Sequence, residues 1–238
     1  LLAPGQSSSF ALPSSEGIDA ITFASNTTLR EAIMSNGNGA LDQIEGVSPN
    51  DITSSLKEIT SGATSALDQI EVSDYSASDL GEMVQEISSG ATQALGNIKI
   101  DGISSDNLSF MMEKVTAGAT GALGQISMEG YSSSNLTTML SKITSGATSA
   151  LGDIEMEGYS SNNLSLMVEK ITAGATSALD EIKLEDFSSD NLSSMVQEIT
   201  SGATGALDEI EMAGFDPSTD VFSMTEKVIL GTTGALSE

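Results

Sequence analysis

The sequence predicts an all-α fold, a helical repeat solenoid of about eight units of 28 residues each. Three observations predict it: a recurring short motif, a helix-start signal ahead of each copy, and apolar residues at helical spacing. The motif reads G-A-T-x-A-L and recurs every 28 residues, returning after 29 as Gly231-Thr232-Thr233. Its other copies begin at Gly62, Gly90, Gly118, Gly146, Gly174 and Gly202.

Each unit begins with residues that favour the start of a helix. In Tyr131-Ser132-Ser133-Ser134-Asn135-Leu136, a serine follows an apolar residue and precedes an aliphatic one. Serine at the N-cap accepts hydrogen bonds from unpaired backbone N–H groups, and the flanking apolar pair packs as a hydrophobic staple. Pro49 and Pro217 stand one residue after the expected N-cap, where the missing N–H of proline costs little.

An apolar stripe follows the start signal at steps of three or four residues, which predicts one buried helix face. In one unit it comprises Leu136, Met139, Leu140, Ile143, Ala147, Ala150, Leu151 and Ile154. The unit's end predicts a Schellman motif, in which Ile126 is the helical residue C3, Gly130 is C′ and Tyr131 is C″.

The middle of the unit leaves two structures open. Ser145-Gly146-Ala147-Thr148 contains poor helix formers, and an interior glycine costs about 1 kcal/mol relative to alanine. Either the helix breaks at the glycine, with Thr148 as a second N-cap and two short helices per unit, or it continues and the small residues let neighbouring backbones approach closely.

The alternative fold is an α/β solenoid. Leu151-x-x-Ile154-x-Met156 has the L-x-x-L-x-L outline of a leucine-rich repeat, and 28 residues suit a strand plus a helix. Against it, the following Asn or Cys is replaced by an aromatic residue, and A-L-D-E-I-E-M-E favours helix.

Two regions are expected along the chain. Residues 1–30 fall outside the pattern and form an N-terminal leader that caps the first repeat or docks on a neighbouring subunit, and residues 31–238 form the repeat array. The ending Leu236-Ser237-Glu238 lacks the interunit turn, which predicts an open last unit. The start at Leu1 rather than Met and the acidic, cysteine-free composition favour an exported, trimmed chain at the cell surface or outside the cell, with the periplasm as the alternative.

Composition excludes most chemistry. A net charge of −26 disfavours nucleic acid, and no apolar run is long enough for a membrane span. The chain has no His and no Cys, so the commonest general base and the thiol nucleophile are missing, and we expect no enzyme, no catalytic residues and no cofactor. Calcium is the one ligand considered, at Glu157, Glu185 and Asp190 near the interunit turns, but no calcium-loop motif accompanies them.

These features together predict a non-enzymatic structural or adhesive protein, such as a surface appendage, a filament subunit or an envelope scaffold. The expected partner is a second copy of the chain, in a homo-oligomer or a filament. The alternative function is a solenoid binding module that presents an extended surface to a protein or carbohydrate partner.

Overall fold

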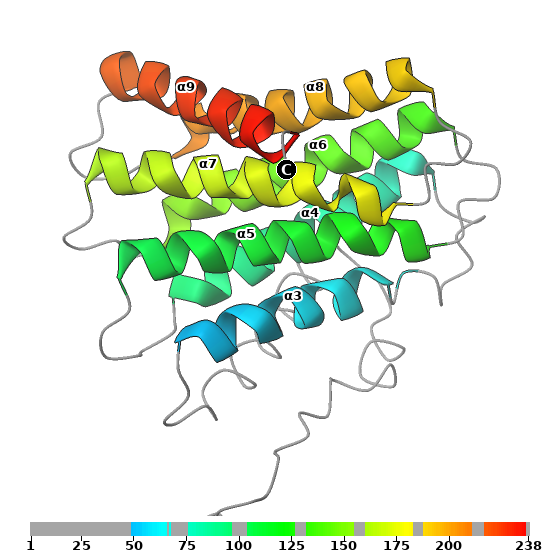
Figure 1. Ribbon diagram of the computed structural model, residues 1–238, viewed down its shortest axis with the longest axis horizontal. Coiled ribbons are helices and arrows are strands. Elements are labelled where there is room, and N and C mark those ends of the chain that lie inside the picture. Colours follow the sequence, from blue (N-terminus) through cyan, green and yellow to red (C-terminus); the bar gives the residue numbers. More distant parts are fainter. Residues whose placement is uncertain are drawn as a thin grey trace, which may run out of the picture.

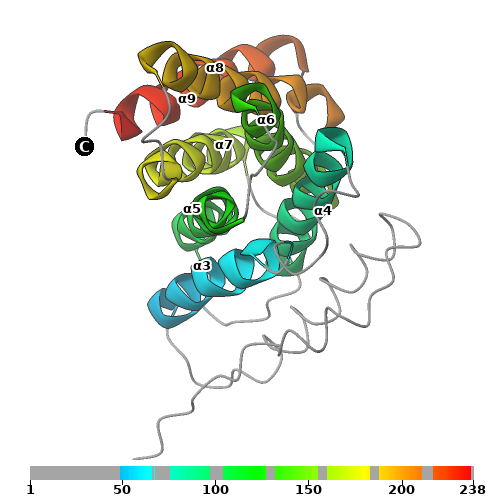
Figure 2. The ribbon, with the colours of Figure 1, turned by 90° about the vertical axis from the view of Figure 1, so that its right-hand side faces the viewer.

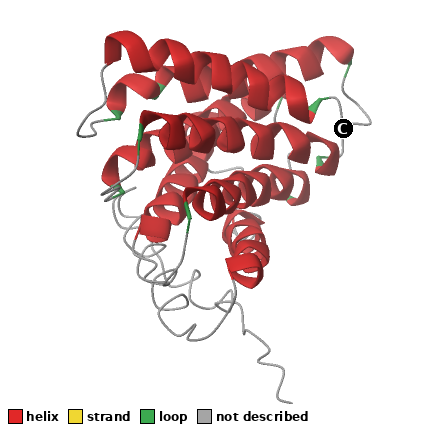
Figure 3. Ribbon diagram, turned by 60° about the vertical axis from the view of Figure 1, so that its left-hand side comes forward, coloured by secondary structure: helices red, strands yellow, loops and turns green. Residues whose placement is uncertain are grey.

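The protein is described here by a computed structural model, which places residues 49–65, 67, 76–96, 104–126, 132–154, 160–182, 188–210 and 217–236. Within these residues every regular element is helical, and no strand is present (Figure 3). The all-α prediction is confirmed and the α/β alternative is not supported. The expectations for residues 1–30, and with them the count of eight units, lie outside the described residues.

Each described unit contributes one long α-helix. The seven α-helices are α3 (Pro49–Ser65), α4 (Ala77–Gly96), α5 (Ser105–Ala122), α6 (Ser133–Ser149), α7 (Ser161–Ser177), α8 (Ser189–Gly205) and α9 (Pro217–Ala235). Each of the helices α5 to α8 is followed by a short 3₁₀ helix: η3 (Leu123–Gln125), η4 (Ala150–Asp153), η5 (Ala178–Glu181) and η6 (Leu207–Glu209), respectively.

The helices run through the glycine of the motif. Gly146 lies inside α6 and Gly174 inside α7, so the prediction of a break with Thr148 as a second N-cap is wrong. The alternative, a continuous helix in which small residues permit close packing, is confirmed by the contacts described below.

The helices form two rows (Figures 1 and 2). α3, α5, α7 and α9 lie side by side in one row, and α4, α6 and α8 in the other. Extensive contacts join each helix to the helix two positions away in sequence, whereas consecutive helices touch much less. The repeating unit of the structure is therefore a pair of sequence repeats, one helix in each row.

Side-chain bonds fix the register within each row. Asn163 Nδ2 in α7 donates to Ser105 Oγ in α5 at 2.8 Å, and Asn191 Nδ2 in α8 donates to Ser133 Oγ in α6 at 3.0 Å. Both bonds span 58 residues and join the starts of two helices, and Thr172 Oγ1 bonds Val228 O further along at a separation of 56. A constant offset along the helices means that row neighbours run parallel.

The predicted apolar stripe is the core. Its eight side chains in the α6 unit are all buried, and the methionines at the matching positions fill the space between the rows. The buried methionines are Met83, Met111, Met112, Met139, Met167, Met195 and Met224.

The helix starts agree with the predicted caps. Serine is the N-cap of α5, α6, α7 and α8, and α3 and α9 begin at Pro49 and Pro217. An asparagine at N3 completes a capping box in those four helices; in α6 the Ser132 N–H donates to Asn135 Oδ1 at 2.7 Å.

The helix ends differ from the prediction. Ile126 was expected to be helical, but its backbone is extended, with φ −78° and ψ 134°, after the helix tightens into η3. Ile126 returns to the core from an extended segment, so the Schellman assignment with Ile126 as C3 is wrong. Gly130 and Tyr131, the other residues of that motif, lie outside the described residues.

Candidate functional site

The motif glycine makes the closest backbone contact between row neighbours. A Cβ atom at Gly174 of α7 would lie 2.9 Å from the carbonyl carbon of Glu113 in α5 and 2.5 Å from Thr116 Oγ1, where no such atom fits. The same crowding against a carbonyl two helices earlier occurs at Gly118, Gly146, Gly202 and Gly231. In α5 to α9 the glycine is therefore required for the approach of two backbones, which explains why these helices tolerate a poor helix former.

A threonine two residues before the glycine forms the other side of the contact. Thr144 Oγ1 in α6 lies 3.1 Å from Leu140 O of its own helix and 3.1 Å from Ile199 O in α8. Thr172 in α7 makes the equivalent approach to Val228 O in α9 at 3.4 Å. The small threonine side chain leaves room for the glycine of the helix two positions later, and its hydroxyl hydrogen-bonds to the backbone of that helix.

Charge pairing occurs along the first row. Lys170 Nζ in α7 lies 2.8 Å from Glu113 Oε2 in α5, and Lys227 Nζ in α9 lies 2.7 Å from Glu169 Oε2 in α7. The Lys170 ammonium also lies 4.4 Å from the ring centroid of Phe110, a cation–π distance. Because these side chains remain partly exposed, the pairs set register more than they add stability.

The calcium candidates are not brought together in the described part of the chain. Glu157 and Glu185 lie outside it, and Asp190 is an exposed residue in the first turn of α8. No group of three or more Asp, Glu, His or Cys side chains that could hold a metal occurs among the described residues.

The last helix exposes an apolar stripe. The exposed fractions are 78% for Phe222, 51% for Ile229, 48% for Leu230 and 54% for Leu236. Phe222 and Ile229 match Ser165 and Thr172 of α7, which are buried there, and Thr172 contacts α9. Single exposed apolar residues are ordinary on protein surfaces, but Phe222, Ile229 and Leu236 share one side of α9, with Leu230 next to Ile229, and together they mark a candidate interaction surface.

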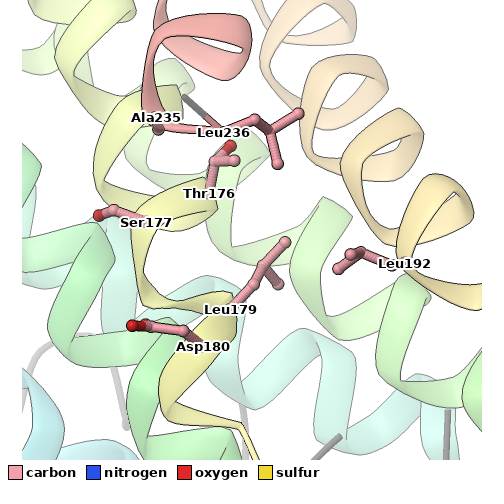
Figure 4. A pocket seen from close by; sticks show the side chains of 7 residues that line it. All are labelled: Thr176, Ser177, Leu179, Asp180, Leu192, Ala235 and Leu236. Carbon is pink, nitrogen blue, oxygen red and sulfur yellow. The ribbon is translucent and has the colours of Figure 1, made fainter. Parts of the chain in front are cut away.

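A hollow adjoins the end of this stripe (Figure 4). It encloses about 480 Å³ and is lined by side chains of α7, η5, α8 and α9, with Leu236, Leu179 and Leu192 facing the space between the helices. Its polar lining includes Thr176, whose buried hydroxyl has no hydrogen-bond partner in the described structure. Leu236 belongs to both the hollow and the stripe.

The sequence contained a signal for this surface that motif searching missed. When the units are aligned on the motif glycine, Phe222, Ile229 and Leu230 replace Ser193, Thr200 and Ser201 of the preceding unit. Three small polar residues thus become large apolar ones only in the last unit. A position-by-position comparison of copies finds the change, whereas a search for conserved repeat positions passes over it.

Comparison with known proteins adds little. No family model matches the chain, and no curated protein is significantly similar to it. One solved structure, described as "Computational Design of Self-Assembling Cyclic Protein Homooligomers", matches 94% of this chain and 89% of its own at 11% identity and a TM-score of 0.39. A TM-score at this level does not establish a common fold, so function is argued from the chain's own residues.

The length and apolar character of a helix decide whether it can cross a membrane. Within the described residues, no helix combines the length and the apolar character that crossing a bilayer requires.

Proposed function

We propose that this chain is a non-enzymatic structural or adhesive protein that acts through its shape and by association with copies of itself, as a surface appendage, a filament subunit or an envelope scaffold. The proposal places it on the outside of the cell, in keeping with its acidic, cysteine-free composition. The self-association and the location are the parts that experiment must test.

The observation that carries the proposal is the uniformity of the array. The same glycine-to-carbonyl contact is made by five successive helices, α5 to α9, each against the helix two before it. A contact repeated in this way builds a rigid array of defined length, and additional units lengthen the array without changing its cross-section. Repeated units that differ little provide such a body more readily than they provide one asymmetric chemical centre.

The surface charge supports a role in assembly that depends on ionic conditions. At a net charge of −26, copies repel one another at low ionic strength, and salt or divalent cations reduce that repulsion. Assembly at an exterior of moderate or high ionic strength would therefore be favoured over assembly in dilute buffer.

The test is negative-stain electron microscopy with multi-angle light scattering, in low salt, in high salt, and with millimolar calcium at matched ionic strength. Ordered oligomers, filaments or sheets in any condition support the proposal. A monodisperse monomer in every condition contradicts it and favours the binding-module alternative. Assembly with calcium but not with sodium at equal ionic strength would indicate specific cation sites rather than screening.

A further inference from the structure

The exposed stripe of α9 occupies the position at which the row would otherwise continue. In α7 the corresponding face presents Ser165, Thr172 and Ala173, which are small enough for α9 to pack closely on them. In α9 the face presents Phe222, Ile229 and Leu230. An outer cap is expected to be polar, and this face is not.

A further helix of the same repeat does not fit this face. The row contact needs a threonine hydroxyl that bonds the incoming backbone and leaves room for its glycine, as Thr172 does for α9 near Gly231. At the same position Ile229 has no hydroxyl and a longer side chain. The incoming carbonyl would lose its hydrogen bond and the incoming helix would be held further away. The occupant must therefore accept large apolar side chains.

The spacing of the stripe is symmetric. Phe222, Ile229 and Leu236 stand seven residues apart, two helical turns at each step, which is the spacing of a helix-pairing seam. If a second copy of α9 lies antiparallel across it, Ile229 meets Ile229 at the centre, and each Phe222 meets the other copy's Leu236.

Charge permits this pairing. The exposed acid on this part of α9 is Glu226, three residues from the centre, so it falls near the exposed Thr233 of the second copy rather than opposite an acid. The two Glu226 carboxylates are offset by six residues, about 9 Å along the helix axis. Lys227 is engaged by Glu169 within its own copy and is not needed at the seam.

We propose that the stripe of α9 is a homodimer interface, in which two copies pair their last helices antiparallel about a two-fold axis at Ile229. This inference rests on the self-association in the proposed function and names the surface that mediates it. In this dimer, Phe222 of each copy lies over the other copy's Leu236. Figure 4 shows Leu236 at the hollow between α7, α8 and α9. The dimer joins two arrays end to end and doubles the length of the body.

The interface is small. A single pair of helices of this length falls at the low end of specific interfaces, about 1,200 Å² in total, so we expect a dissociation constant on the order of micromolar. Because both copies are strongly acidic, the dimer becomes tighter as salt is raised.

Sedimentation equilibrium measures the stoichiometry, and engineered cysteines locate the interface. The chain contains no cysteine, so any disulfide formed comes from the introduced residue. Ile229→Cys lies on the axis and is expected to cross-link to itself, whereas Gly205→Cys, at an exposed site at the end of α8, is not. Phe222→Cys and Leu236→Cys are expected to cross-link when mixed, and far less when each is alone.

The double variant Phe222→Ser with Ile229→Thr restores the residues of the preceding unit and is expected to weaken dimerisation at least tenfold with unchanged helix content. Dimers that cross-link through Ile229→Cys and are lost in the double variant support the inference. Oligomers that persist in the double variant without the Ile229→Cys cross-link overturn the α9 interface but leave self-association standing. A monomer at about 100 μM in high salt overturns both, because that concentration is well above the expected dissociation constant.

Discussion

Replacing Gly174 by alanine tests the contact on which the whole array is built. The new methyl group would lie 2.5 Å from Thr116 Oγ1 and 2.9 Å from the Glu113 carbonyl carbon, so α7 must move away from α5 by about 1 Å to restore ordinary contact. Overpacking of this kind costs about 1–3 kcal/mol, and the obstacle here is backbone, which cannot rotate aside as a side chain can. Alanine's higher helix propensity offsets about 1 kcal/mol. We expect a net loss of up to about 2 kcal/mol, or a fall in Tm of up to about 8 °C.

Gly62 provides the matched control. It is the glycine of the same motif in α3, a helix of the same row, but no atom of the described residues lies within 4 Å of its Cβ position. Gly62→Ala therefore gains the helix propensity without the clash, and we expect it to raise stability by about 0.5–1 kcal/mol. Urea and thermal unfolding followed by circular dichroism measure both variants. If Gly174→Ala stabilises the protein as Gly62→Ala does, the close-approach explanation of the motif is refuted.

Three further predictions address caps, hydrogen bonds and charge. Hydrogen bonds from Ser76 lower the pKa of Asp79 below its ordinary 3.8. The ionised Asp79 therefore stabilises the fold above pH 3.8, and this stabilisation is lost as the pH falls through the lowered pKa. In a circular-dichroism titration, Asp79→Asn should make stability depend less on pH below about pH 4. Thr144→Val removes the bond to α8 from a fully buried site and should cost about 0.5–1.5 kcal/mol in urea unfolding, with an unchanged midpoint arguing that this bond adds nothing. Lys227→Met breaks a partly exposed ion pair and should cost about 0.5 kcal/mol in low salt and less in high salt; a loss above about 2 kcal/mol would show that the pair is more than a surface contact.

Local signals predicted the elements well. Helix starts and buried faces depend on residues that are close together in the sequence, namely serine caps, proline at the first helical position and apolar spacing. The structure places the helices and the core where these signals indicate. The helix ends were predicted less well because Ile126, although buried, reaches the core in an extended conformation after a 3₁₀ turn. At Gly124 in that turn, a Cβ atom would lie 2.7 Å from Glu181 O, a contact from a unit further along that no local pattern reveals.

The continuity of the helix through the glycine could not be decided from one unit. Helix propensity predicts only that Gly146 destabilises its own helix. The stabilising contact that offsets this cost is made with the backbone of α4, two units earlier, around Gln85. This contact exists only because the fold brings α6 against α4, and the sequence of one unit does not contain that information. The candidate surface on α9 is different, because substitutions at Phe222, Ile229 and Leu230 are visible in sequence once the units are aligned.

The pairing of alternate helices also has a trace in the sequence. In the first row, α5, α7 and α9 carry Glu-Lys at 113–114, 169–170 and 226–227, but α3 carries Lys57-Glu58. In the second row, α4 and α8 carry Gln-Glu at 85–86 and 197–198, and α6 carries Ser141-Lys142. From α5 to α9, each Glu of the first row therefore lies where the Lys of the next helix in that row reaches it. Removing α6 alone would move α8 onto α5 and set Glu198 against Glu113, while removing α6 and α7 together would set Lys227 against Glu113. From α5 to α9, the charges of the first row thus distinguish the correct row neighbours from shifted ones, whereas the motif, which is the same in every unit, does not.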